Sequence, residues 1–304
     1  MKKLLSHLKP HIRWVILGAT LFFLASALRE NWREVNAIEI DRQGWIALSL
    51  AFVGTMLAQT WAGLVWGWIL QEFNQTADPV WATRTFLKTN IAKYLPGNIW
   101  HFYRRVWAAQ KAGISIEIAT LSVVVEPLLM ASAALSMGLV LAASNAWMWQ
   151  GAALAVVATT LHPRVLSPVA ERLSSAKAKA FRSQKPEGAI FEMKRYPLRP
   201  WLGELGFLVW RGGGFVLIVM ALGSVSLSQL PLLISGFSLA WLLGLIIPGA
   251  PGGLGVFEAT ALSLLDNTFS PGLILSSVAV YRIISILAEA GGAGLAILDE
   301  RWRG

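Results

Sequence analysis

The chain is dominated by apolar runs of fifteen or more residues, separated by short polar connections. This feature constrains the fold most, because about 20 apolar residues cross the hydrocarbon core of a bilayer as a helix. Apolar residues make up 55% of the 304 residues and charged residues 14%, whereas soluble domains have about 45–50% and about 25%. We therefore expect an all-α, polytopic membrane protein that forms one integral membrane domain over residues 1–304.

Six of the apolar runs are predicted as full transmembrane helices. They are Trp14–Leu28, Trp45–Leu70, Ile114–Ala143, Trp147–Leu161, Leu202–Leu222 and Leu273–Leu298. The first run follows a basic N-terminus and ends at an Ala-Ser-Ala sequence, which is the pattern of a signal-peptidase site. Because further spans follow, we expect an uncleaved first helix, and cleavage of residues 1–27 is the alternative.

Two stretches do not fit a simple span, because proline and glycine divide each of them into two arms. The arms are Trp81–Leu95 and Asn98–Ala112 around Pro96-Gly97, and Leu233–Ile247 and Leu254–Asp266 around the run from Pro248 to Gly253. Proline and glycine both break helices. Each arm reaches about 20 Å, whereas the hydrocarbon core is about 30 Å thick. Both stretches are therefore predicted as re-entrant helical hairpins.

The two Pro-Gly breaks lie 152 residues apart, which is half the length of the chain. Residues 1–143 and 144–304 then each contain three full spans and one hairpin. An odd number of spans turns the second half upside down relative to the first, an inverted repeat of the kind that transporters use. An accidental duplication, in which one hairpin crosses the membrane fully, is the alternative.

Basic residues gather near the N-terminus and in the loop 162–200, which holds nine basic and three acidic residues. Loops rich in lysine and arginine stay on the cytoplasmic side of a membrane. We therefore expect both termini and this loop to be cytoplasmic. The net charge of +9 follows this topology, so we expect no nucleic-acid partner.

The segment from Ile247 to Glu258, IPGAPGGLGVFE, is the most specific motif in the chain. Its glycines let the backbone approach a ligand closely and adopt positive φ. A helix predicted to begin near Leu254 offers free N–H groups and the positive end of its dipole to an anion. Glu258, one turn into that helix, is placed to receive a cationic group. The alternative is a tight structural hairpin with Glu258 as its cap.

Four charged residues lie toward the middle of the predicted spans: Glu126, Arg211, Arg282 and Glu289. Each charge at the centre of a bilayer costs about 2.5–3.5 kcal/mol on insertion scales. Arg282 and Glu289 are seven positions apart and share one helical face. Such residues indicate a polar cavity that serves a function. The alternative is ion pairing among these carboxylates and arginines that only fixes helix packing.

The first hairpin is strongly basic, and Arg84, Lys88, Arg104 and Arg105 are its candidate phosphate ligands. Arg84 and Lys88 share one helix face, four positions apart. Arginine binds phosphate bidentately, so the neighbouring Arg104 and Arg105 fit a lipid phosphate. Anchoring of a shallow hairpin at the cytoplasmic side is the alternative. The chain has no cysteine and only four scattered histidines, so we expect neither a metal site nor a cofactor.

Three motifs and the hydrophobic profile resemble the transmembrane family of lysylphosphatidylglycerol synthases, which includes the flippase portion of the bacterial multiple peptide resistance factor. The motifs are KYLPGNIWHFYRR, PGAPGGLGVFEA and the Tyr-Arg pair at 281–282. The resemblance covers nearly the whole chain. It implies a protein of the inner membrane that handles polar lipids, such as aminoacylated phosphatidylglycerol. The positions that it marks are Pro248, Gly249, Gly252, Gly253, Gly255, Glu258 and Arg282.

Only residues 299–304 follow the last predicted span, whereas the full-length resistance factor carries a soluble synthase domain there. We therefore expect a translocase for an anionic or aminoacylated lipid head group rather than an enzyme. Membrane lipids are its expected partners, and any synthase would be a separate protein. The alternatives are a membrane-embedded transferase, or its accessory subunit, acting on aminoacyl lipids or polyprenyl-linked sugars, and a non-transporting assembly factor. The sequence contains no nucleotide-binding motif in favour of the transferase.

Overall fold

The computed structural model describes residues 31–94, 99–142, 196–247 and 253–303, with a few isolated positions near 26–29 and between 151 and 168. Within these residues the chain is helical and contains no strand, which confirms the all-α fold class. The elements are α2 (Trp32–Asn36), α3 (Arg42–Glu72), α4 (Pro79–Asn90), η1 (Ile91–Tyr94), α5 (Trp100–Lys111), α6 (Ile116–Leu141), α9 (Leu198–Leu222), η2 (Leu227–Gln229), α10 (Leu230–Ile246), α11 (Val256–Leu265) and α12 (Pro271–Arg303), where η marks a 3-10 helix.

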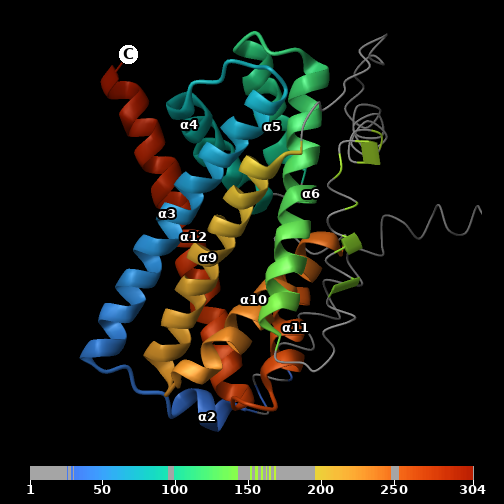
Figure 1. Ribbon diagram of the computed structural model, residues 1–304. Helices are drawn as coiled ribbons and strands as arrows, with labels where there is room; N and C mark the ends of the chain where they lie inside the picture. The colour runs from blue at the N-terminus through green and yellow to red at the C-terminus, as the bar shows by residue number, and fades with distance from the viewer. Residues whose placement is uncertain are drawn as a thin grey trace, which may run out of the picture.

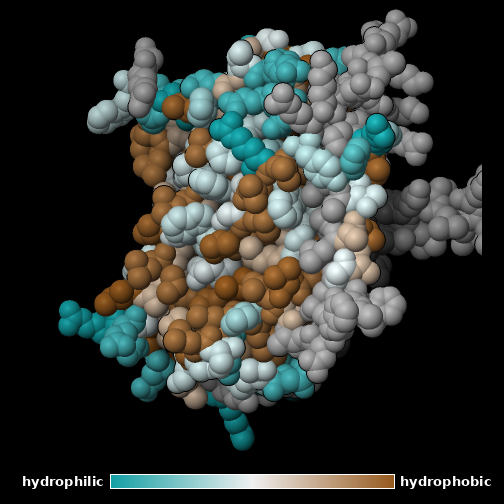
Figure 2. Space-filling view, viewed as in Figure 1, coloured by the Kyte–Doolittle hydropathy of each residue, from teal (hydrophilic) through white to brown (hydrophobic). Residues whose placement is uncertain are grey.

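Five helical segments are long and apolar enough to cross a membrane: α3, α6, α9, α10 together with η2, and α12. Their outward faces carry apolar side chains such as Leu50, Val209 and Ile283, each more than half exposed. Figure 2 shows apolar side chains gathered over the side of the bundle, with hydrophilic groups toward its two ends. Such a surface suits contact with lipid hydrocarbon. These features fit a multi-pass membrane protein.

Four of the predicted spans agree with α3, α6, α9 and α12, whose ends lie within five residues of the predicted ones. Side-chain caps begin two of these helices, because Asp41 accepts from the Gly44 N–H at 2.7 Å and Ser115 from the Ile118 N–H at 3.4 Å. The predicted span Trp14–Leu28 lies almost entirely outside the described residues. Most of the span Trp147–Leu161 and most of the loop 162–200 also lie outside them.

Helices α4 and α5 correspond to the two arms of the first predicted hairpin. Each has 12 residues, about 18 Å of helix, which is too short for the hydrocarbon core. Asp78 begins α4 by accepting from the Trp81 N–H at 2.9 Å, and Pro79 takes the first helical position. The two helices pack against each other, and α5 also packs against α6. The turn that contains Pro96-Gly97 lies outside the described residues.

Helices α10 and α11 correspond to the second predicted hairpin, but α10 is longer than its predicted arm. It has 17 residues and begins at Leu230, and η2 extends it to a 20-residue stretch long enough to cross a membrane. The prediction that both arms are too short is therefore wrong for α10. The early start is explained by Pro231, which the first turn of a helix tolerates. With 10 residues, α11 is short.

The bundle is organised around α3 and α9, which pack along each other more extensively than any other pair of helices. Gly203 of α9 allows this approach, since a Cβ there would lie 2.6 Å from Val65 and 2.9 Å from Trp68. Trp61 of α3 donates to the Gly203 carbonyl at 2.7 Å. Figure 1 shows α4, α5 and the C-terminus near one end of the bundle and α11 near the other. The two pairs of helices from the predicted hairpins thus approach the interior from different ends.

Candidate functional site

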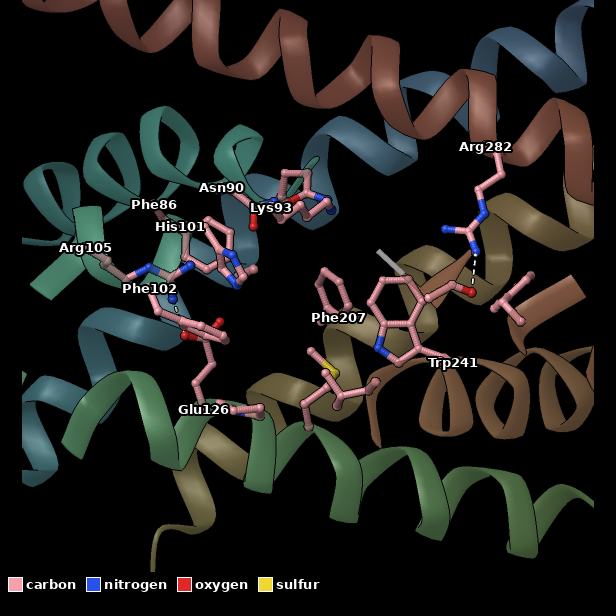
Figure 3. A pocket seen from close by; sticks show the side chains of 18 residues that line it. Phe86, Asn90, Lys93, His101, Phe102, Arg105, Glu126, Phe207, Trp241 and Arg282 are labelled. Atoms are coloured by element: carbon pink, nitrogen blue, oxygen red, sulfur yellow. Dashed lines mark hydrogen bonds and ion pairs between the residues drawn. The ribbon is translucent and has the colours of Figure 1, made fainter. Parts of the chain in front are cut away.

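A cavity of about 340 Å³, hereafter the central cavity, lies inside the bundle and is lined by both the α4–α5 and the α10–α11 regions. Figure 3 shows polar and aromatic side chains interleaved around it. The polar ones are Gln59, Asn90, Lys93, His101, Arg105, Glu126 and Arg282, and the aromatic ones include Phe86, Phe102, Phe207, Trp241 and Phe257. Because lipid hydrocarbon does not accept charged groups, such a cavity offers a polar environment that the surrounding membrane lacks.

Arg105 of α5 and Glu126 of α6 form an ion pair at the α4–α5 end of the central cavity. The Arg105 side chain is 1% exposed. Its guanidinium carbon lies 4.2 Å from the ring centroid of Phe86 and 5.4 Å from that of Trp66, so cation–π attraction adds to the pairing. The carboxylate and the two rings hold a fixed positive charge at the cavity wall.

Glu289 of α12 is the centre of a second polar group. Lys93 Nζ lies 2.7 Å from Glu289 Oε1, and Gln59 Nε2 donates to the same oxygen at 3.1 Å. Gln59 in turn accepts from Asn90 Nδ2 at 3.0 Å. Because each member orients the next, this network ties α3, α4 and η1 to α12. Three of its four side chains, all except Glu289, line the cavity.

At the α10–α11 end, Arg282 of α12 pairs with Glu258 of α11, with 2.8 Å between Nε and Oε1. Arg282 Nη2 also donates to the Gly253 carbonyl at 3.1 Å, and the second oxygen of Glu258 accepts from the Gly255 N–H that precedes α11. The φ angles of Gly253 and Gly255 are +72° and +84°, values that glycine adopts readily. Glu258 therefore caps α11, as the structural interpretation predicts, and also holds an arginine that lines the cavity.

Arg211 of α9 differs from the other two interior arginines, because none of the described carboxylates pairs with it. It is 2% exposed, and its Nε and Nη1 make no hydrogen bond. Its guanidinium carbon lies 4.9 Å from the ring centroid of Tyr281, 5.1 Å from Trp241 and 6.0 Å from Phe207. Trp241 and Phe207 line the cavity and Arg211 does not, so Arg211 lies behind the aromatic wall.

The interior ion pairs differ from those that the sequence suggests, because three of the four charges near the middle of the predicted spans pair with residues of other segments. The observed pairs are Arg105–Glu126, Lys93–Glu289 and Arg282–Glu258. In every pair one partner belongs to a spanning helix and the other to a short element: α5, η1 or α11. The short helices therefore bring the counter-charges to the depth at which the spanning helices carry theirs.

Sequence reasoning did not select five interior polar residues: Gln59, Asn90, Lys93, His101 and Glu204. Glu204 of α9 is 1% exposed and close enough to Arg105 and Glu126 to interact electrostatically with both. Gln59 and Glu204 are polar side chains inside otherwise apolar runs, and this signal was available in the sequence. Lys93 belongs to the basic first hairpin, where nothing in the sequence distinguishes it from its basic neighbours.

Arg84 and Lys88 do not line the central cavity. Arg84 pairs with Asp299, and Lys88 Nζ lies 2.7 Å from Glu300 Oε2. Both contacts join the outer part of α4 to the C-terminal part of α12, and their side chains are partly exposed. These two cations therefore connect helices near the surface of the protein.

Arg104 is exposed, whereas the adjacent Arg105 is buried, so the two arginines face different surroundings. A shared phosphate contact would require both side chains to reach one place.

Of the positions in the glycine-rich motif, Pro248, Gly249 and Gly252 lie outside the described residues.

Comparisons with protein-family models and with curated proteins find no match to this chain. Among the described residues, no group of three or more histidine, aspartate or glutamate side chains is placed to hold a metal ion. The arrangement that the structure does present is a cavity with charged and aromatic side chains in its wall, inside an apolar bundle. Chemically, it can bind and orient a charged group.

Proposed function

We propose that this protein moves the head group of a polar phospholipid between the two leaflets of the inner membrane. The observation that carries the proposal is the central cavity, whose wall places charged side chains among aromatic ones inside a bundle with apolar outer faces. A head group that crosses a bilayer unaided meets the same penalty as any charge in hydrocarbon. A wall of paired charges lowers that penalty, while the acyl chains stay in the surrounding lipid.

The topology of the proposal follows the inverted-repeat interpretation. The α4–α5 region enters from the cytoplasmic side together with the C-terminus, and α11 returns to the opposite side. The separation of these regions toward the two ends of the bundle supports this arrangement. A head group would then meet Arg105 from one side and Arg282 from the other, with the central cavity between them.

Single cysteines test this topology, because the chain contains no cysteine of its own. A cysteine at Ser6 or Ser174 should react with a membrane-impermeant thiol reagent only from the cytoplasmic side, and one at Asn36 only from outside. Labelling of Ser174→Cys from outside would contradict the inverted-repeat topology.

Lipid exchange in liposomes tests the function directly. The purified chain, reconstituted with a phospholipid carrying a fluorescent head group, should speed the loss of inner-leaflet fluorescence when an impermeant quencher is added outside. Arg105→Gln/Glu126→Gln removes both charges of one pair together and should slow the exchange about tenfold, the effect of losing about 1.4 kcal/mol of stabilisation of the crossing head group. Arg104→Gln, at the exposed neighbouring position, is the matched control and should exchange lipid at the wild-type rate.

Exchange no faster than in protein-free liposomes would contradict the proposal. The same liposomes, supplied with aminoacyl-tRNA or a sugar donor, separate it from the transferase alternative by mass spectrometry of the lipids. A new covalent lipid product made by the chain alone would favour the transferase.

A further inference from the structure

Helix α9 carries two buried charges of opposite sign, Glu204 and Arg211, which are 1% and 2% exposed. Seven positions separate them, so they lie on one face of the helix, about 10 Å apart along its axis. Phe207 lies between them on the same face and lines the central cavity. Neither Glu204 nor Arg211 lines the cavity itself, so two opposite charges lie behind its wall along a single helix.

At the Arg211 end, the described cations outnumber the carboxylates. Lys93 and Arg282, which act electrostatically in the same region, already have carboxylate partners. Arg211 has none among the described residues, and its Nε and Nη1 and the Trp241 Nε1 make no hydrogen bond. Buried donors without hydrogen bonds and a buried cation without a carboxylate are costly, and an anion would satisfy both.

At the Glu204 end, the described carboxylates outnumber the cations. Arg105 is the cation that acts on Glu204, and its Nη1 is already bonded to Glu126. Glu204 forms no ion pair with the described residues, and its Oε2 makes no hydrogen bond. An ionised carboxylate at this depth needs a further cation to offset its desolvation.

We propose that the central cavity takes a zwitterionic phospholipid head group, with the phosphate at Arg211 and the ammonium at Glu204. This inference rests on the proposed function and names the substrate class. The excess cation and the excess carboxylate neutralise the two charges of one zwitterion, whereas a purely anionic head group leaves Glu204 without a partner. Phe207 and Trp241 stand between the cavity and Arg211, so the phosphate reaches the guanidinium when these rings turn aside. The Trp241 N–H is then a second donor to it.

Binding measurements on the purified full chain in detergent test the assignment. Two short-chain phospholipids with identical acyl chains are compared by native mass spectrometry, one with a phosphoethanolamine and one with a phosphoglycerol head group. The wild type should bind the zwitterionic lipid about tenfold more tightly, as one charge-assisted hydrogen bond provides. Glu204→Gln should lower the affinity for the zwitterionic lipid about tenfold and leave the affinity for the anionic lipid unchanged.

Arg211→Gln should lower the affinity for both lipids about tenfold, because both carry the phosphate. Trp241→Phe removes the indole N–H as a donor and should lower the affinity for both lipids about threefold. This variant tests the position of the phosphate independently of the arginine. Arg104→Gln, an exposed substitution that also removes one arginine, should change neither affinity. Free phosphoethanolamine, which lacks acyl chains, should bind much more weakly than the lipid.

Equal affinity of the wild type for the two lipids would overturn the inference, and so would a preference that Glu204→Gln leaves intact. Equally tight binding of free phosphoethanolamine would overturn the lipid as the ligand. The liposome assay separates this inference from the proposed function. Exchange of both lipids at equal rates would leave the function standing and overturn the substrate class. A head-group preference in binding without any exchange would support the substrate class and overturn the function.

Discussion

The ion pairs at the two ends of the central cavity differ in which charge the short helix supplies. At the α4–α5 end the short helix supplies the cation, since Arg105 of α5 pairs with Glu126 of the spanning helix α6. At the α10–α11 end the short helix supplies the carboxylate, since Glu258 of α11 pairs with Arg282 of the spanning helix α12. Both pairs tie a helix too short to cross the membrane to one that is long enough.

The two pairs also differ in what else holds them. Arg105 is 1% exposed and is surrounded by aromatic side chains, whereas the Arg282 side chain is 21% exposed and also contacts the Gly253 backbone. Glu258 in addition caps α11 through Gly255. The first pair is therefore held through side-chain contacts. The second pair also stabilises a backbone turn, so the loss of one partner should cost different amounts at the two ends.

The largest effect is expected for Arg105→Gln. It leaves Glu126 without its partner, and breaking a buried pair in this way costs about 3–5 kcal/mol. The free energy of unfolding, measured by SDS titration in mixed micelles, should fall by this amount. Arg105→Gln/Glu126→Gln should recover most of the loss, because no uncompensated charge remains. A double variant as unstable as the single one would show that the pairing is not the cause.

A smaller loss, about 2–3 kcal/mol, is expected for Glu258→Gln. The amide can still accept from the Gly255 N–H, and Arg282 keeps its bond to the Gly253 carbonyl. The same titration measures the effect, with the exposed variant Asp266→Asn near the end of α11 as the control. A loss as large as that of Arg105→Gln would remove the difference between the two ends.

Arg211→Gln should act in the opposite direction and raise the free energy of unfolding by about 1 kcal/mol. Its guanidinium is buried without a carboxylate partner among the described residues, so a neutral side chain lowers the desolvation cost of folding. Thermal unfolding of Arg211→Gln and Arg105→Gln in detergent gives the sign of the change in stability for each variant. A loss of stability similar to that of Arg105→Gln would mean that Arg211 is held by a carboxylate after all.

The smallest effect is expected for Lys88→Met at the exposed pair with Glu300, whose side chains are 27% and 60% exposed. Exposed pairs contribute about 0–1 kcal/mol, because water screens them. The free energy of unfolding should change within that range, and the change should disappear at high salt. A larger, salt-independent loss would place this pair with the interior ones.

Local patterns in the sequence predicted much of the fold. Long apolar runs predicted α3, α6, α9 and α12, because the hydrocarbon thickness alone sets the length that a run must have. Proline and glycine predicted the divisions between α4 and α5 and between α10 and α11. The predicted length of α10 was wrong, because a proline at the second position of a helix resembles a helix boundary when only the sequence is known.

The candidate site was predicted only in part. The sequence identified the charges at 126, 211, 282 and 289 as interior residues, since a charged side chain within a long apolar run must be kept away from lipid hydrocarbon. It did not identify their partners, because Lys93, Arg105 and Glu258 come from short helices whose depth in the bundle no local pattern specifies. Nor did the sequence show that Arg105 is buried and Arg104 exposed, because the packing of the other helices decides which of two adjacent arginines is buried.

By itself, the sequence determined that the segments of α3, α6, α9 and α12 are helical and long enough to cross a membrane. Both properties depend on composition over a stretch of contiguous residues and on the thickness of hydrocarbon. Only the tertiary structure decided which charges neutralise one another and which, like Glu204 and Arg211, stay unpaired among the described residues. Electrostatic pairing acts over a few ångströms in space between residues far apart in the chain, so it is defined only once the helices have packed.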